Sequence, residues 1–112
     1  MSEDTQGGEF VFVYTTLPSV AVAEAMGRAL VAAKLAACVN IYPGLRSVYE
    51  WGDEVVVEDE VAAFIKTRAA LAEAAMAAAR KLHPYEVPAL LTLPILAGNA
   101  DYLDWARKQT QG

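Results

Sequence analysis

The sequence predicts an α+β fold, a ferredoxin-like βαββαβ sandwich with a long hairpin between its second and third strands and a short C-terminal helix. Segments rich in β-branched and aromatic residues alternate with two segments of helical periodicity in this order. The length of 112 residues is enough for one domain and leaves no room for a second. The hydrophobic fraction of 55 % is high for a small soluble protein, and it indicates further burial between subunits.

The first part of the chain predicts a tail, a strand and a helix. Residues 1–9 are polar and acidic, and we expect a disordered N-terminal tail ahead of a single domain over residues 10–112. Residues 10–14 are a continuous run of β-formers, which is typical of a strand buried on both faces. Ser19 can cap the helix that follows. The apolar stripe of that helix consists of Val22, Met26, Leu30, Val31 and Leu35.

A long hairpin is predicted next. Residues 37–42 begin its first strand, which Pro43-Gly44 interrupts as a bulge or bend. Gly52-Asp53 is typical of a hairpin turn. The apolar residues that alternate along the return strand are Val55, Val57, Val61, Ala63 and Ile65. Because the hairpin is long for so small a domain and bare sheet edges invite pairing, we expect an oligomer that uses both.

The second half predicts a helix, an edge strand and a final short helix. Residues 68–82 contain eight alanines, and Pro84 ends this helix. Its expected apolar stripe consists of Leu71, Ala75, Ala78 and Leu82. Residues 87–96 predict a fourth strand, at an edge or an end of the sheet because Pro94 interrupts it. Asn99 can cap the final helix.

Charge and cysteine content limit the classes of function. The net charge of −5 repels phosphate backbones, so we expect no nucleic-acid partner. The chain has neither a signal peptide nor a run of about 18 uncharged apolar residues, so we expect no membrane partner. Cys38 is the only cysteine, which rules out an intrachain disulfide and suits a cytoplasmic location. Because G-x-S-x-G and glycine-rich phosphate loops are absent, we expect no enzyme; a small hydrolase that uses carboxylates and His83 is the alternative.

Several segments together resemble the CutA (divalent-cation tolerance) family, in its order and over nearly the whole chain. Three of them are KLAACVNI at residues 34–41, SVYEW at residues 47–51 and HPYEVP at residues 83–88. The others are residues 43–44, 60–61, 66–67, 93–95, 98–99 and 101–103, and Trp105. The resemblance implies a ferredoxin-like subunit, a homotrimer, and a response to divalent metal ions, with copper the metal usually named. It also implies an architecture similar to PII signalling proteins, whose clefts between subunits bind small effectors.

Two functions follow from the resemblance. One is a divalent-cation tolerance protein, a trimer that binds copper or another divalent metal at clefts between subunits. The other is a PII-like trimeric module that binds a small effector or a protein partner, and for which metal binding is incidental.

His83, the only histidine, is the candidate metal ligand. The alternative is a turn histidine that hydrogen-bonds the backbone. The resemblance supports a ligand, but some relatives carry a second histidine just before it and a cysteine near the end of the first strand. This chain has Leu82 and Thr15 there. With one histidine per subunit we expect weak binding of Cu²⁺ or another divalent metal, with a carboxylate and water completing the shell.

The other candidates are expected at an interface or a cleft between subunits. Cys38 lies among apolar residues, which favours a buried core cysteine over a soft metal ligand. Glu60 lies in a matched segment, and we expect it in an interface salt bridge, with Lys66 or with a cation of a partner subunit. Its neighbour Glu58 is expected on the same side of the strand and Asp59 on the other. Large aromatic residues are typical of subunit contacts and also line ligand clefts; these are Tyr49, Trp51, Tyr85, Tyr102 and Trp105.

Overall fold

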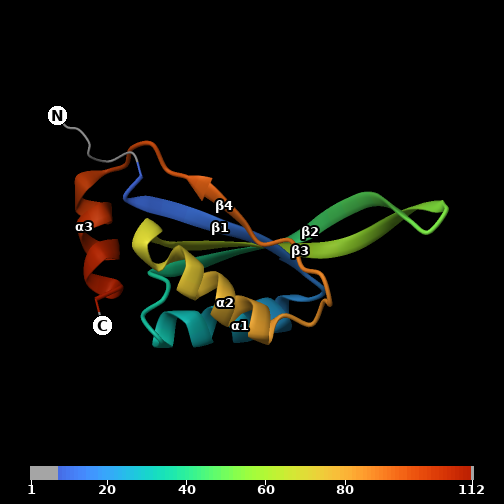
Figure 1. Cartoon of the computed structure of the whole chain (residues 1–112), viewed down its shortest axis with the longest axis horizontal. Coiled ribbons are helices and arrows are strands. Elements are labelled where there is room, and N and C mark those ends of the chain that lie inside the picture. Colours follow the sequence, from blue (N-terminus) through green and yellow to red (C-terminus); the bar gives the residue numbers. More distant parts are fainter. Residues whose placement is uncertain (1–7, 112) are drawn as a thin grey trace.

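The structure, a computed structural model, describes residues 8–111 and contains one sheet with two helices on one side and a third at one end (Figure 1). The elements in chain order are β1 (Phe10–Leu17), α1 (Val20–Ala32), β2 (Cys38–Trp51), β3 (Glu54–Arg68), the short 3₁₀ turn η2 (Ala69–Leu71), α2 (Ala72–Leu82), β4 (Leu91–Pro94) and α3 (Ala100–Gln109). The four strands are antiparallel in the order β2-β3-β1-β4. The predicted α+β arrangement, with two helices on one face and the fourth strand at an edge, is confirmed.

The core lies between the sheet and helices α1 and α2. Met26 and Leu30 of α1 pack against Val13 of β1 and Ile65 of β3, and all four are almost completely buried. Each such side chain contributes about 1.5–3 kcal/mol by leaving water. The helix begins where predicted, because the Val22 backbone N–H donates to Ser19 Oγ at 3.2 Å.

The hairpin of β2 and β3 extends well beyond the helices, as Figure 1 shows, and the molecule measures 50 Å along its longest axis. Its turn lies at Gly52, whose φ of +64° favours glycine. The pairing of β2 with β3 shifts register between Tyr42 and Leu45, and Gly44 has a φ of +86° there. The predicted turn and the predicted bulge are therefore confirmed.

Two predicted elements differ from the observed ones. In α2 the buried residues are Ala72, Ala75 and Ala79, whereas Leu82 is 48 % exposed, so the predicted stripe is rotated. Because alanines lie on every side of this helix, the apolar residues alone do not determine which side faces the sheet. Close packing against the sheet determines it. Strand β4 covers only residues 91–94 of the predicted 87–96, and it ends at Pro94, which has no backbone N–H to donate.

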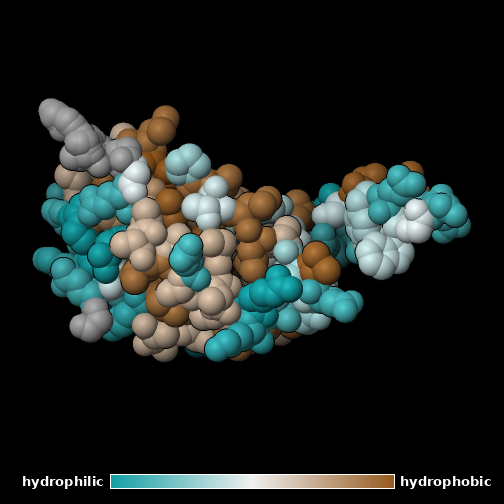
Figure 2. Space-filling view, in the orientation of Figure 1, coloured by the Kyte–Doolittle hydropathy of each residue, from teal (hydrophilic) through white to brown (hydrophobic). Residues whose placement is uncertain are grey.

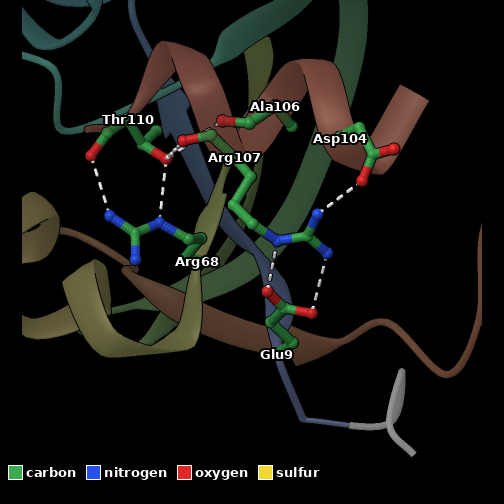
Figure 3. Close-up of polar contacts among 6 residues, drawn as sticks. All are labelled: Glu9, Arg68, Asp104, Ala106, Arg107 and Thr110. Carbon is green, nitrogen blue, oxygen red and sulfur yellow. Dashed lines mark hydrogen bonds and ion pairs between the residues drawn. The ribbon is translucent and has the colours of Figure 1, made fainter. Parts of the chain in front are cut away.

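Helix α3 is fastened to one end of the sheet by two arginines (Figure 3). Arg107 donates to both carboxylate oxygens of Glu9, at 2.7 and 3.0 Å. Arg68 donates to the side chain and the backbone carbonyl of Thr110, at 2.9 and 2.8 Å. This ion pair involves Glu9, the last residue of the predicted tail of residues 1–9. Residues 1–7 lie outside the described part of the chain, and the disordered tail stays a prediction. Asn99 caps the helix as predicted, by accepting from the Asp101 N–H at 3.0 Å.

The face of the sheet away from α1 and α2, which we call the open face, carries an aromatic cluster. The Phe64 ring lies within 6.2 Å of the rings of Phe12, Tyr14 and Tyr42, measured between centroids. Tyr42 on edge strand β2 is 62 % exposed. Hydrophobic residues also reach the surface across the middle of the body, whereas hydrophilic ones gather around α3 (Figure 2). The chain on its own therefore leaves considerable apolar surface in water.

Candidate functional site

A cleft of about 690 Å³ lies between the hairpin and the loop that joins α2 to β4. We call it the hairpin cleft. Four of the residues predicted at an interface or cleft line it together: Tyr49, Trp51, Glu60 and Tyr85. Its other lining residues were not predicted at a cleft; these are Thr16, Val56, Glu58, Pro84, Glu86, Val87 and Ala89.

Glu60 ties the hairpin to the loop. Ser47 Oγ donates to its Oε1 at 2.6 Å, and the Tyr85 hydroxyl donates to its Oε2 at 2.7 Å. Glu60 pairs with Leu45 directly after the bulge, so this contact is made at the base of the projecting part of the hairpin. Burial, followed by the hydrogen bond to Glu60, raises the pKa of Tyr85 well above its ordinary value, so Tyr85 stays a donor.

A second phenol–carboxylate pair lies farther along the hairpin. The Tyr49 hydroxyl donates to Glu58 Oε1 at 2.5 Å, and this bond raises the pKa of Tyr49. Glu58 and Glu60 both line the cleft, whereas Asp59 pairs with Arg46 at 3.0 Å and does not line it. The predicted alternation of the three carboxylates is thus confirmed. The same alternation puts Glu58 on the side of the strand that carries Glu60, so Glu58 could have been predicted at the cleft from the sequence.

His83 is buried beside the cleft and its ring is hydrogen-bonded on both sides. Nδ1 accepts from the Tyr85 backbone N–H at 3.2 Å, so the proton of the neutral ring lies on Nε2. Nε2 donates to the Thr16 carbonyl at 2.9 Å and lies 3.0 Å from Thr15 Oγ1. Burial lowers the pKa of His83 and favours this neutral form. The contacts match the predicted turn histidine, and a metal ligand at His83 stays a prediction.

The remaining predicted residues lie away from the hairpin cleft, at the end of the sheet near α3. Lys66 Nζ sits over the rings of Phe12 and Tyr102, 5.4 Å from each centroid, and makes no salt bridge with Glu60. The Tyr102 and Trp105 rings are 5.6 Å apart. These residues cover a separate patch that adjoins the open face.

Cys38 corrects a prediction. It is half-buried and pairs with Lys66 on the neighbouring strand, instead of filling the core. The adjacent Val39 takes the core-facing position, and because side chains alternate along a strand, Cys38 faces the other way.

Among residues 8–111, no three histidine, cysteine, aspartate or glutamate side chains gather closely enough to hold a metal ion. Within the same range, no helix is long and apolar enough to cross a membrane.

Comparisons with known proteins agree with one another. The model of the CutA1 divalent ion tolerance protein family matches residues 11–109. The divalent-cation tolerance protein CutA of Thermus thermophilus is 46 % identical over 88 % of this chain and 95 % of its own length. Protein CutA of Homo sapiens is 39 % identical over 93 % of this chain, which spans 58 % of that longer protein. The crystal structure of CutA1 from Ehrlichia chaffeensis is similar with a TM-score of 0.90 at 31 % identity, over 94 % of this chain and 98 % of that one. This chain therefore belongs to the CutA1 divalent ion tolerance family.

Proposed function

We propose that this protein is a non-catalytic, homotrimeric binding protein that serves divalent-cation tolerance, with a ferredoxin-like subunit and its ligand site in the hairpin cleft. The relative from Thermus thermophilus is named a divalent-cation tolerance protein. The observation that carries the proposal is the cleft itself, in which carboxylates and aromatic rings from distant parts of the chain converge. A cytoplasmic location stays a prediction.

The trimer is supported by the surface that one subunit leaves uncovered. The open face exposes an aromatic cluster, and β2 and β4 are the two edges of the sheet. The projecting hairpin makes the subunit elongated, at 50 × 27 × 22 Å. A second and a third copy would cover the aromatic cluster and pair or shield the edges.

We expect Cu²⁺ or another divalent metal to bind weakly, through His83 with a carboxylate such as Glu60 and water. Weak binding follows from the hydrogen bonds of the ring. A metal can reach Nδ1 only if the bond from the Tyr85 N–H breaks, and Nε2 only if its proton and its bond to Thr16 are lost. Each loss subtracts from the affinity that an imidazole normally gives.

The test is calorimetric titration of tag-free protein with Cu²⁺ at pH 7, beside His83→Ala. We expect weak binding that disappears in the variant while light scattering still reports a trimer. Tight binding, or binding that survives the substitution, would contradict the assignment of His83.

The second candidate is a PII-like module for a small effector, to which metal binding is incidental. The size of the hairpin cleft favours it, since about 690 Å³ suits a small organic molecule. Native mass spectrometry of tag-free protein separates the two: a retained metal supports the first function and a retained organic ligand the second.

A further inference from the structure

The hairpin cleft carries charge of one sign. Its charged lining residues are Glu58, Glu60 and Glu86, and no lysine, arginine or histidine lines it. Within residues 8–111, none of these three carboxylates takes part in a salt bridge. Neutral hydroxyl groups donate to the carboxylates of Glu58 and Glu60, and the Arg80 guanidinium donates to the backbone carbonyl of Glu86 at 3.4 Å. With no salt bridge to any of the three carboxylates, the cleft attracts a cation from solution.

The walls of the cleft are aromatic. Tyr49, Trp51 and Tyr85 line it, and Trp51 is 75 % exposed although it is the largest side chain of the hairpin. The face of an aromatic ring attracts a cation within about 6 Å of its centre, and tryptophan does so most strongly. An exposed tryptophan beside unpaired carboxylates offers both kinds of cation contact in one place.

Size separates an organic cation from a metal ion. A divalent metal requires several ligands within about 2–2.6 Å, and the described residues bring no three suitable side chains together. The cleft of about 690 Å³ is instead in the range of small-molecule sites. Carboxylates too dispersed for a metal can still bind the several N–H donors of an ammonium or guanidinium group.

We propose that the hairpin cleft binds a small organic cation, an ammonium or guanidinium group on an apolar body. Its N–H groups donate to the free Oε2 of Glu58 and to the remaining lone pairs of Glu60. The apolar body lies on Trp51 and Val56. Tyr49 and Tyr85 hold the two carboxylates in place. This inference rests on the proposed function, because it names the ligand class for the cleft of a non-catalytic binding protein.

The experiment compares benzylammonium with benzyl alcohol, which has the same apolar body and no charge, by calorimetric titration of the tag-free assembled protein. We expect benzylammonium to bind about tenfold more tightly, from a surface-type ion pair together with a cation–π contact. Added NaCl should weaken the binding of the cation and leave that of the alcohol unchanged.

Two variants with the same change of charge locate the site. Glu58→Gln should weaken benzylammonium binding about threefold, a loss typical of one exposed ion pair. Asp59→Asn is the matched control, because Asp59 neighbours Glu58 but pairs with Arg46 and does not line the cleft; it should leave the affinity unchanged.

Three results would overturn the inference: equal affinity for the two compounds, equal effects of the two variants, or no binding of the cation. The Cu²⁺ titration and the trimer mass are measured on the same preparation. If these behave as proposed while the cation does not bind, the ligand class is wrong and the proposed function stands. If the protein is a monomer, the proposed function fails on its own, and if His83→Ala binds Cu²⁺ unchanged, the assignment of His83 fails on its own.

Discussion

Replacing Tyr42 with alanine tests whether the open face is the contact between subunits. Tyr42 is 62 % exposed in the subunit, and within the subunit its ring contacts Phe64 at 6.0 Å between centroids. A large aromatic side chain has about 200 Å² to bury, so about 120 Å² of Tyr42 is available to a partner. At about 25 cal/mol per Å², covering it stabilises the trimer by about 3 kcal/mol per subunit, or about 9 kcal/mol in all.

Inside one subunit the same substitution removes only the aromatic contact, which is worth about 1 kcal/mol. The two contributions differ in their dependence on concentration, because dilution favours separated subunits. We therefore expect Tyr42→Ala to dissociate at micromolar concentrations at which the unsubstituted protein stays trimeric. Light scattering over a dilution series measures the mass, and urea denaturation at two protein concentrations measures the stability.

Leu82→Ala is the matched control, because Leu82 is also an exposed apolar residue but lies on α2, on the other side of the sheet. It should leave the mass and the dilution profile unchanged. If Tyr42→Ala keeps its trimer mass on dilution and loses no more stability than Leu82→Ala, the open face is not the interface.

Three further predictions concern buried groups. Thr67→Val should stabilise the protein by about 1 kcal/mol in urea denaturation, because Thr67 Oγ1 is buried without a hydrogen-bond partner among residues 8–111; a loss of stability would refute this. Because burial lowers the pKa of His83 below that of the unfolded chain, about 6.5, the unfolded state binds the proton first and stability falls as pH drops below about 6.5. His83→Gln should flatten the dependence of the unfolding free energy on pH in this range. An identical slope in the variant would show that other groups cause the dependence. Thr15→Cys should raise the affinity for Zn²⁺ at least about tenfold by calorimetry, since Oγ1 already lies 3.0 Å from His83 Nε2 and a thiolate is a better ligand; unchanged affinity would place the metal elsewhere.

The spacing of apolar residues along the chain predicted those helices and strands that have one polar and one apolar face. The stripe with Met26 and Leu30, the turn at Gly52 and the cap at Asn99 each rest on local chemistry that tertiary contacts do not override. The phase of α2 was harder to predict, because alanines occupy its exposed side as well as its buried one. Cys38 was misassigned for a similar reason, since apolar residues occupy both faces of its strand.

The candidate site was predicted in part. Tyr49, Trp51 and Glu60 were each expected at an interface or a cleft, and they do line one cleft. Glu86 lies in the loop between α2 and β4, and the path of this loop brings it to the same cleft. No pattern in the sequence specifies that path. The double hydrogen bonding of the His83 ring depends on Thr16, a residue 67 positions away in the chain, and is a consequence of the fold alone.

Assembly is central to the proposed function, because further copies would cover the open face and the sheet edges that one chain leaves in water. Native mass spectrometry of tag-free protein at micromolar concentration measures it directly. We expect a single species at three times the subunit mass of 12.0 kDa. A species at one or two subunit masses, stable over the concentration range, would contradict the trimer and with it the proposed function.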